Sequence, residues 1–125
     1  MDDYNLRGPM KKAKKIKDTS THTKQKMGAV ITKHGRVIGI GCNVQKTHPI
    51  FADGKKSYSI HCEVNAIISS RTDLRGTTIY VYREINGVPA LAKPCKNCLK
   101  IIVESGIKRI IYSIGYFPYY EQIDL

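Results

Sequence analysis

Two short stretches of this 125-residue chain carry residues that could do chemistry. The first is the triplet His61-Cys62-Glu63, and the second, about 30 residues further on, is the run Pro94-Cys95-Lys96-Asn97-Cys98. A catalytic zinc ion takes three protein ligands and leaves its fourth tetrahedral position to water. His61, Cys95 and Cys98 supply a set of three such ligands. The two stretches therefore predict a zinc site with one open position.

Glu63 is left over from this ligand set, and the metal site gives it a different task. A carboxylate beside an activated water, but not on the metal, can take the proton of the water and deliver it to a ring nitrogen and then to departing ammonia. That chemistry is hydrolytic deamination, and H-x-E followed by P-C-x-x-C is typical of zinc-dependent deaminases. A lone C-x-x-C is often a redox pair or half of a structural zinc site, so the prediction depends on both stretches together.

Each stretch leads into a predicted helix. Apolar residues recur at helical spacing after both stretches: Val64, Ile67 and Ile68 in the first, and Leu99, Ile102 and Val103 in the second. The ligands should therefore sit at helix N-termini, with Pro94 in the first helical position of the second helix. The positive ends of the two helix dipoles would lower the thiol pKa values and favour the thiolates that bind zinc.

The other elements must position these two helices. Residues 9–18 predict a surface helix with a narrow apolar stripe, and residues 27–33, 37–43, 77–83 and 107–113 predict strands, the first two joined by a tight turn. We expect connections over residues 44–60 and 84–93, the second with a turn at Asn86-Gly87, and a tail over residues 114–125. This order predicts an α/β sandwich, with helices packed on a mixed central sheet whose first two strands are antiparallel.

Length and composition indicate a single domain, residues 1–125, of a soluble globular protein. Hydrophobic residues make up 42% of the chain and charged residues 25%. No apolar run is long enough to span a membrane, and the N-terminus lacks the apolar centre of a signal peptide, so we expect a cytoplasmic protein with no membrane partner. Four cysteines without a secretory signal favour metal binding over disulfides, and Cys42 and Cys62 need no role beyond packing.

The charge of the chain is strongly positive. It has 21 Lys and Arg residues against 10 Asp and Glu residues, a formal net charge of +11, and residues 1–40 contain ten of the basic residues but only three of the acidic ones. Such a balance favours a polyanion, either the phosphate of a nucleotide or the backbone of a nucleic acid. A lysine-rich face that only keeps the protein soluble is the alternative explanation.

The two motifs also carry a family resemblance. The run KMGAVITKHGRVIGIGCN followed by HCEVNAI resembles deoxycytidylate deaminases, and nearly the whole chain resembles the cytidine deaminase superfamily. The resemblance implies a cytidine deaminase-like sandwich with the zinc site at the N-termini of two helices. It implies His61, Cys95 and Cys98 as the zinc ligands, and Glu63 as the proton shuttle.

Two further residues take a role from the resemblance. Asn43 stands where the family commonly has an asparagine that bonds the sugar or base of the target nucleotide, although it is also a good turn residue to end a strand. Lys93 stands where related enzymes often have Ser or Glu, at a position that offers its backbone carbonyl to the exocyclic amine of the base. The change of side chain at Lys93 therefore need not alter this role.

The C-terminal tail departs from a plain deoxycytidylate deaminase. Five of the ten aromatic residues of the chain lie within residues 112–120. In polynucleotide cytosine deaminases of the APOBEC type, a similar loop contacts the base beside the target, which makes Tyr116 and Phe117 candidate substrate-binding residues. The alternative is a tail that packs its aromatic rings on the sheet or in a dimer interface.

The leading hypothesis is a zinc-dependent cytosine deaminase that converts cytosine to uracil in (deoxy)cytidine nucleotides, with single-stranded DNA or RNA as the favoured substrate. The main alternative is a deaminase of free dCMP or another cytidine nucleotide. Deamination of adenosine in tRNA is a weaker enzymatic alternative. A zinc-stabilised nucleic-acid-binding module without catalysis is an alternative from another class. Many members of the superfamily form dimers or tetramers, so a homo-oligomer is a further expectation.

Overall fold

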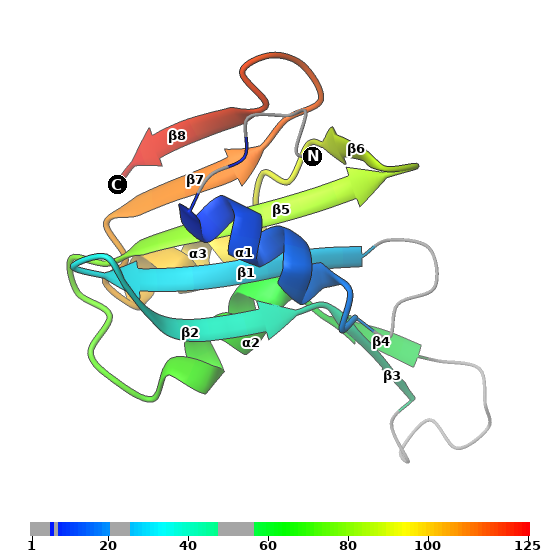
Figure 1. Ribbon diagram of the computed structural model, residues 1–125. Coiled ribbons are helices and arrows are strands. Elements are labelled where there is room, and N and C mark those ends of the chain that lie inside the picture. Colours follow the sequence, from blue (N-terminus) through cyan, green and yellow to red (C-terminus); the bar gives the residue numbers. More distant parts are fainter. Residues whose placement is uncertain (1–5, 7, 21–25, 48–56) are drawn as a thin grey trace.

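The computed structural model describes residues 6, 8–20, 26–47 and 57–125 of the chain (Figure 1). In chain order, the elements are α1 (Gly8–Lys17), β1 (Lys26–Lys33), β2 (Arg36–Cys42), β3 (Val44–Thr47), β4 (Ser57–Ile60), α2 (Cys62–Ser70), β5 (Thr78–Ile85), β6 (Val88–Ala90), α3 (Lys96–Glu104), β7 (Arg109–Ser113) and β8 (Tyr120–Asp124). Among the described helices, none has the length and apolar character that a membrane crossing requires.

The main sheet is mixed, as predicted. Its strand order is β2-β1-β5-β7-β8, and β6 pairs with the C-terminal end of β5. β1 is antiparallel to both β2 and β5, whereas β5 and β7 are parallel because α3 carries the chain across between them. The β1–β2 turn is made by His34 and Gly35, whose positive φ angles of 51° and 77° suit a two-residue hairpin.

Alternating side chains divide the core into two clusters, one on each face of the sheet. On one face, Ala29 and Ile31 of β1 pack with Ala66 of α2 and Ile102 of α3. On the other face, Val30 and Tyr82 pack against Met10 and Ala13 of α1. Because successive residues of a strand point to opposite faces, α1 covers one face and α2 and α3 cover the other (Figure 1). This three-layer arrangement confirms the predicted α/β sandwich.

Two glycines let the helices lie directly on the strands. A Cβ atom at Gly28 of β1 would overlap the carbonyl oxygen of Ala13 in α1. On the other face, a Cβ atom at Gly41 of β2 would overlap the backbone of Cys62 and Ala66 in α2. Only glycine leaves room for so close an approach, so Gly41 sets the distance between β2 and the first turn of α2.

The predicted connections are partly wrong, because each contains short strands. β3 and β4 pair with each other at the two ends of residues 44–60, and the middle of that connection, residues 48–56, lies outside the described residues. β5 runs on to Ile85 and folds back through Asn86-Gly87 into β6. The tail adds β8, which is antiparallel to β7. β8 is mostly exposed, so no apolar alternation marks it in the sequence.

Candidate metal centre and active site

His61, Cys95 and Cys98 come together where α2 and α3 begin. His61 is the N-cap residue of α2 and Cys95 is the N-cap residue of α3, while Cys98 lies in the first turn of α3. Their ligand atoms all lie within 4.8 Å of one another. This placement at helix N-termini is as predicted. Pro94, however, precedes the N-cap instead of taking the first helical position.

The local geometry of each helix start turns the three side chains toward one another. The Cys95 sulfur accepts a hydrogen bond of 3.5 Å from the backbone N–H of Cys98, which folds the C-x-x-C pair into one turn. His61 makes no side-chain capping bond to its own helix. Its Nδ1 atom instead lies 3.0 Å from the sulfur of Cys98 and 3.6 Å from the sulfur of Cys95.

This set of donors fits a zinc ion. A tetrahedral zinc ion holds a nitrogen and a sulfur ligand about 3.6 Å apart, given typical Zn–N and Zn–S bonds of about 2.05 and 2.3 Å. The separation of His61 Nδ1 from the Cys95 sulfur, 3.6 Å, matches this value, and that from the Cys98 sulfur, 3.0 Å, is shorter by about 0.6 Å. One imidazole and two thiols leave a fourth position for water, as in catalytic sites.

Glu63 lies beside this cluster, in the first turn of α2, and is only 3% exposed. The thiol of the buried Cys62 donates a hydrogen bond of 3.1 Å to its Oε1 atom. His61 and Cys95 are exposed, whereas Cys98 is buried, so the cluster connects the protein surface with the interior where Glu63 lies. The contact between Cys62 and Glu63 was not expected from the sequence, because nothing in the pattern distinguishes this cysteine from a packing residue.

Before a metal binds, the Cys98 thiol keeps its proton. Burial raises the pKa of Cys98 well above its ordinary value, and the charge of Glu63 and the contact with Cys95 raise it further. Burial, the charge of Glu63 and the hydrogen bond to it raise the pKa of Cys62 in the same way. Without a metal, burial and the neighbouring charge thus oppose the lowering of the Cys98 pKa that the helix dipole was predicted to give. A metal that binds Cys98 must displace a proton.

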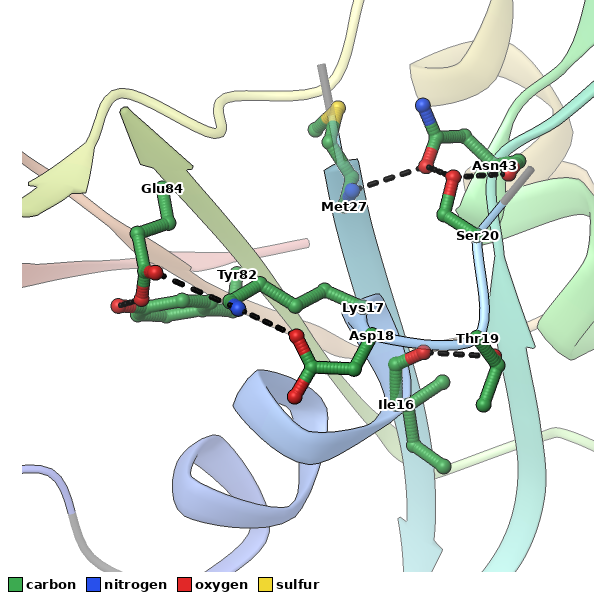
Figure 2. Close-up of polar contacts among 9 residues, drawn as sticks. All are labelled: Ile16, Lys17, Asp18, Thr19, Ser20, Met27, Asn43, Tyr82 and Glu84. Carbon is green, nitrogen blue, oxygen red and sulfur yellow. Dashed lines mark hydrogen bonds and ion pairs between the residues drawn. The ribbon is translucent and has the colours of Figure 1, made fainter. Parts of the chain in front are cut away.

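Asn43 directly follows β2. The carbonyl of the preceding residue, Cys42, accepts a 2.6 Å hydrogen bond from Asn65 of α2. Asn43 is 5% exposed, and its Oδ1 atom accepts hydrogen bonds from the backbone N–H of Met27 and the hydroxyl of Ser20 (Figure 2). Asn43 thus follows the end of the strand, as one prediction had it, and the residue before it, Cys42, bonds to the helix that carries Glu63.

The remaining candidate residues are at the surface. Lys93 is exposed and comes just before Pro94 and Cys95. Tyr116 and Phe117, in the loop between β7 and β8, are 65% and 75% exposed. Their contacts are with the tail itself, since the Tyr116 hydroxyl donates to Glu121 and the Phe117 ring meets the edge of Tyr119.

A family model described as the cytidine and deoxycytidylate deaminase zinc-binding region matches residues 5–114 of the chain. The chain belongs to this family. A deaminase of Aliivibrio fischeri is 33% identical over 101 residues, which cover 75% of this chain and 59% of that protein. Deoxycytidylate deaminase of Mycobacterium phage D29 is 30% identical over 109 residues, covering 71% of this chain and 78% of the phage protein.

Other relatives of the family are longer. Human deoxycytidylate deaminase is 30% identical over 96 residues, which cover 66% of this chain and 49% of the human protein. The chain thus spans between about half and four fifths of the length of these three relatives.

Solved structures share the fold. The dCMP deaminase of cyanophage S-TIM5, crystallised with dCMP and dUMP, superposes with a TM-score of 0.66 at 21% identity, covering 93% of this chain and 85% of that one. A bifunctional pyrimidine deaminase and uracil reductase of Thermotoga maritima superposes with a TM-score of 0.53 at 29% identity, covering 84% of this chain and 28% of that one. These matches confirm the predicted cytidine deaminase-like fold.

Proposed function

We propose that this family member is a zinc-dependent hydrolase that converts free deoxycytidylate, dCMP, to dUMP and ammonia. The observation that carries the deaminase assignment is the cluster of His61, Cys95 and Cys98 with the buried carboxylate of Glu63 beside it. The choice of dCMP is supported by the relatives, because the phage D29 and human proteins are both named deoxycytidylate deaminases.

In the proposed reaction, three residues bind the metal and a fourth transfers protons. His61, Cys95 and Cys98 would hold the zinc ion. Bound zinc supplies a Lewis acid that makes water nucleophilic at neutral pH. Glu63 takes a proton from the attacking water and passes it to N3 of the cytosine ring. After a C–O bond forms at C4, Glu63 delivers the second proton of the water to the amine, so that the C4–N bond breaks and ammonia and uracil result.

Asn43 and Lys93 would contact the substrate in this scheme. Asn43 directly follows Cys42, whose carbonyl bonds to Asn65 of α2, and we assign Asn43 to the sugar or base of the nucleotide. Lys93 precedes Pro94 and Cys95, and we assign its backbone carbonyl to the exocyclic amine of the base. No contact with free dCMP is assigned to Tyr116 or Phe117, which interact with the tail.

In the part of the chain that the structure describes, the distribution of charge favours a free nucleotide over single-stranded nucleic acid. Lys11, Lys12 and Lys15 of α1 are exposed, but α1 lies on the opposite face of the sheet from α2 and α3, where the cluster is (Figure 1). Near the cluster, Lys93 and Lys96 flank Cys95 and are exposed. One phosphate group needs only one or two cations, whereas a strand of nucleic acid needs a basic path along its backbone. The earlier preference for a polynucleotide is therefore not retained.

The experiment offers the zinc-loaded protein dCMP, CMP and a cytosine-containing single-stranded oligonucleotide in parallel, and detects uracil by mass spectrometry. We expect dUMP from dCMP and no uracil in the oligonucleotide. Glu63→Gln should lower kcat by about 10² to 10⁴, whereas Glu104→Gln, the same change at an exposed position of α3, should leave it unchanged. Uracil in the oligonucleotide alone would identify a polynucleotide deaminase, and no turnover of any substrate would favour a non-catalytic zinc module. That the chain forms a single domain and that it forms a homo-oligomer both stay predictions. Sedimentation of the same sample tests the second.

A further inference from the structure

The turn that follows α1 reaches across the end of the sheet to Asn43. Ser20 is 8% exposed, and its hydroxyl oxygen lies 2.7 Å from Oδ1 of Asn43 and 2.6 Å from the backbone oxygen of the same residue (Figure 2). The single hydroxyl proton can be shared between these two acceptors. Twenty-three residues separate Ser20 from Asn43 in the chain, so this contact exists only in the folded protein.

The hydrogen bonds around Asn43 determine which way its amide points. The backbone N–H of Met27 donates to the side chain of Asn43 over 2.8 Å, and the backbone N–H of Asn43 donates to the carbonyl of Met27 over 3.3 Å. A backbone N–H can only donate, so the side-chain atom that faces Met27 must be oxygen. The amide nitrogen therefore lies on the side away from Ser20 and Met27, as Figure 2 shows.

The turn that carries Ser20 is itself held firmly. α1 sits directly on Gly28, next to Met27 in β1. At the end of α1, the ammonium group of Lys17 lies 2.8 Å from Asp18 and 3.3 Å from Glu84 of β5. The backbone N–H of Ser20 donates to the carbonyl of Lys17 over 3.0 Å, so the ion pair with β5 and the hydroxyl contact with Asn43 belong to one turn.

The hydroxyl of Tyr82 completes this anchor. It donates a 2.7 Å hydrogen bond to the other carboxylate oxygen of Glu84, which fixes the group that Lys17 contacts (Figure 2). The ion pair is shielded from water, since the side chains of Lys17 and Glu84 are 10% and 17% exposed. The position of Ser20 is thus set from the face of the sheet opposite to the metal cluster.

We propose that Ser20 is a positioning residue, which holds the Asn43 side chain in the orientation in which it contacts the bound nucleotide. The inference rests on the proposed function, because it assumes that Asn43 contacts the substrate. Ser20 touches Asn43 and not the group of His61, Cys95 and Cys98, so its loss should weaken nucleotide binding and leave the chemical step nearly unchanged. The loss of one hydrogen bond of this kind corresponds to an increase in KM of roughly three- to tenfold.

The test compares Ser20→Ala, Ser20→Thr and Thr19→Ala. Thr19 lies in the same turn, but its hydroxyl donates to the carbonyl of Ile16, at the end of α1, so it is the matched control. With dCMP we expect Ser20→Ala to raise KM severalfold at nearly constant kcat. Ser20→Thr keeps a hydroxyl and should restore most of the binding, and Thr19→Ala should behave as the unaltered protein.

A double-mutant cycle with Asn43→Ala separates positioning from a general loss of folding. If Ser20 acts through Asn43, Ser20→Ala should raise KM in the parent protein and have little further effect in the Asn43→Ala background. An equal increase in both backgrounds, or an unchanged KM in Ser20→Ala, would overturn the proposal. A fall in kcat without a change in KM would overturn it as well.

Binding measurements distinguish a failure of this inference from a failure of the proposed function. Titration calorimetry with dCMP, CMP and dUMP needs no turnover, and the side-chain amide protons of Asn43 can be followed by NMR in the unaltered protein. We expect nucleotide to shift these amide signals. If the protein binds another nucleotide but does not turn over dCMP, and Ser20→Ala weakens that binding, only the substrate assignment is wrong. If nucleotide leaves the amide signals unchanged, the role of Ser20 is wrong even where dCMP is turned over.

Discussion

The hydrogen bond between Tyr112 of β7 and Glu121 of β8 makes the stability of the protein depend on pH in the alkaline range. The Tyr112 hydroxyl donates to a carboxylate oxygen of Glu121 over 2.6 Å. This bond to a charged acceptor, together with burial, raises the pKa of Tyr112 to about 12, from an ordinary value of 10.0. The bond needs the protonated phenol, so it stabilises the folded state fully below pH 10 and is lost as the pH rises from 10 to 12.

The size of the effect follows from linkage. At pH 11 a tyrosine with a pKa of 10 is mostly ionised in the unfolded chain, whereas one with a pKa of about 12 is mostly protonated in the folded chain. The difference amounts to a loss of about 1.4 kcal/mol of unfolding free energy between pH 8 and pH 11. Because Glu121 is exposed, solvent screening reduces this loss to about 1 kcal/mol.

The assay is urea unfolding of the protein and of Tyr112→Phe at pH 8 and pH 11. Other titrating groups are common to both proteins, so the difference between their unfolding free energies isolates Tyr112. We expect the unaltered protein to be more stable at pH 8 by about 1.5 kcal/mol or more, and this advantage to shrink by about 1 kcal/mol at pH 11. Tyr116→Phe is the matched control, since the exposed Tyr116 hydroxyl lies 3.4 Å from the other oxygen of Glu121. A stability difference for Tyr112→Phe that stays constant with pH would refute the reasoning.

Three further predictions concern the metal cluster. Glu63→Gln should lower kcat by about 10² to 10⁴ and leave the zinc content, measured by atomic absorption, unchanged. Cys98→Ser, or removal of the metal with a chelator, should abolish turnover and lower the melting temperature, and added zinc should reverse only the effect of the chelator. Gly41→Ala places a methyl group against the backbone of Cys62, so it should cost about 1–3 kcal/mol in unfolding free energy and weaken zinc retention. A Gly41→Ala protein with full stability and unchanged zinc affinity would show that α2 is not seated as described.

The sequence alone was sufficient to predict the ligand set and the helices that carry it. His61, Cys95 and Cys98 lie in two short motifs, and each motif is followed by apolar residues at helical spacing, so both signals are local. The hairpin of β1 and β2 was equally clear, because two apolar runs flank a turn. The motifs, the helical spacing and the hairpin turn each depend on residues a few positions apart. They can therefore be read from the sequence without knowing how the chain folds.

The short strands could not be predicted in this way. β6 has only three residues, and β8 has mostly exposed side chains, so neither shows an apolar alternation; both are held by hydrogen bonds to β5 and β7. The aromatic residues near the C-terminus show the consequence. One of these residues, Tyr112, is buried in the core and bonds to Glu121 of β8, whereas Tyr116 and Phe117 are exposed and their role in binding stays a prediction.

The amino-acid sequence was thus enough to bring out the residues that we propose to bind zinc and to shuttle protons, because those chemical types and their spacing are local properties. The tertiary structure alone decided what surrounds them. It placed the lysines of α1 on the face of the sheet away from the cluster, set Cys62 against Glu63, and brought Ser20 to Asn43. The lysine placement and the Ser20 contact depend on how the chain crosses the sheet, and the Cys62 contact depends on side-chain packing, none of which short-range spacing records.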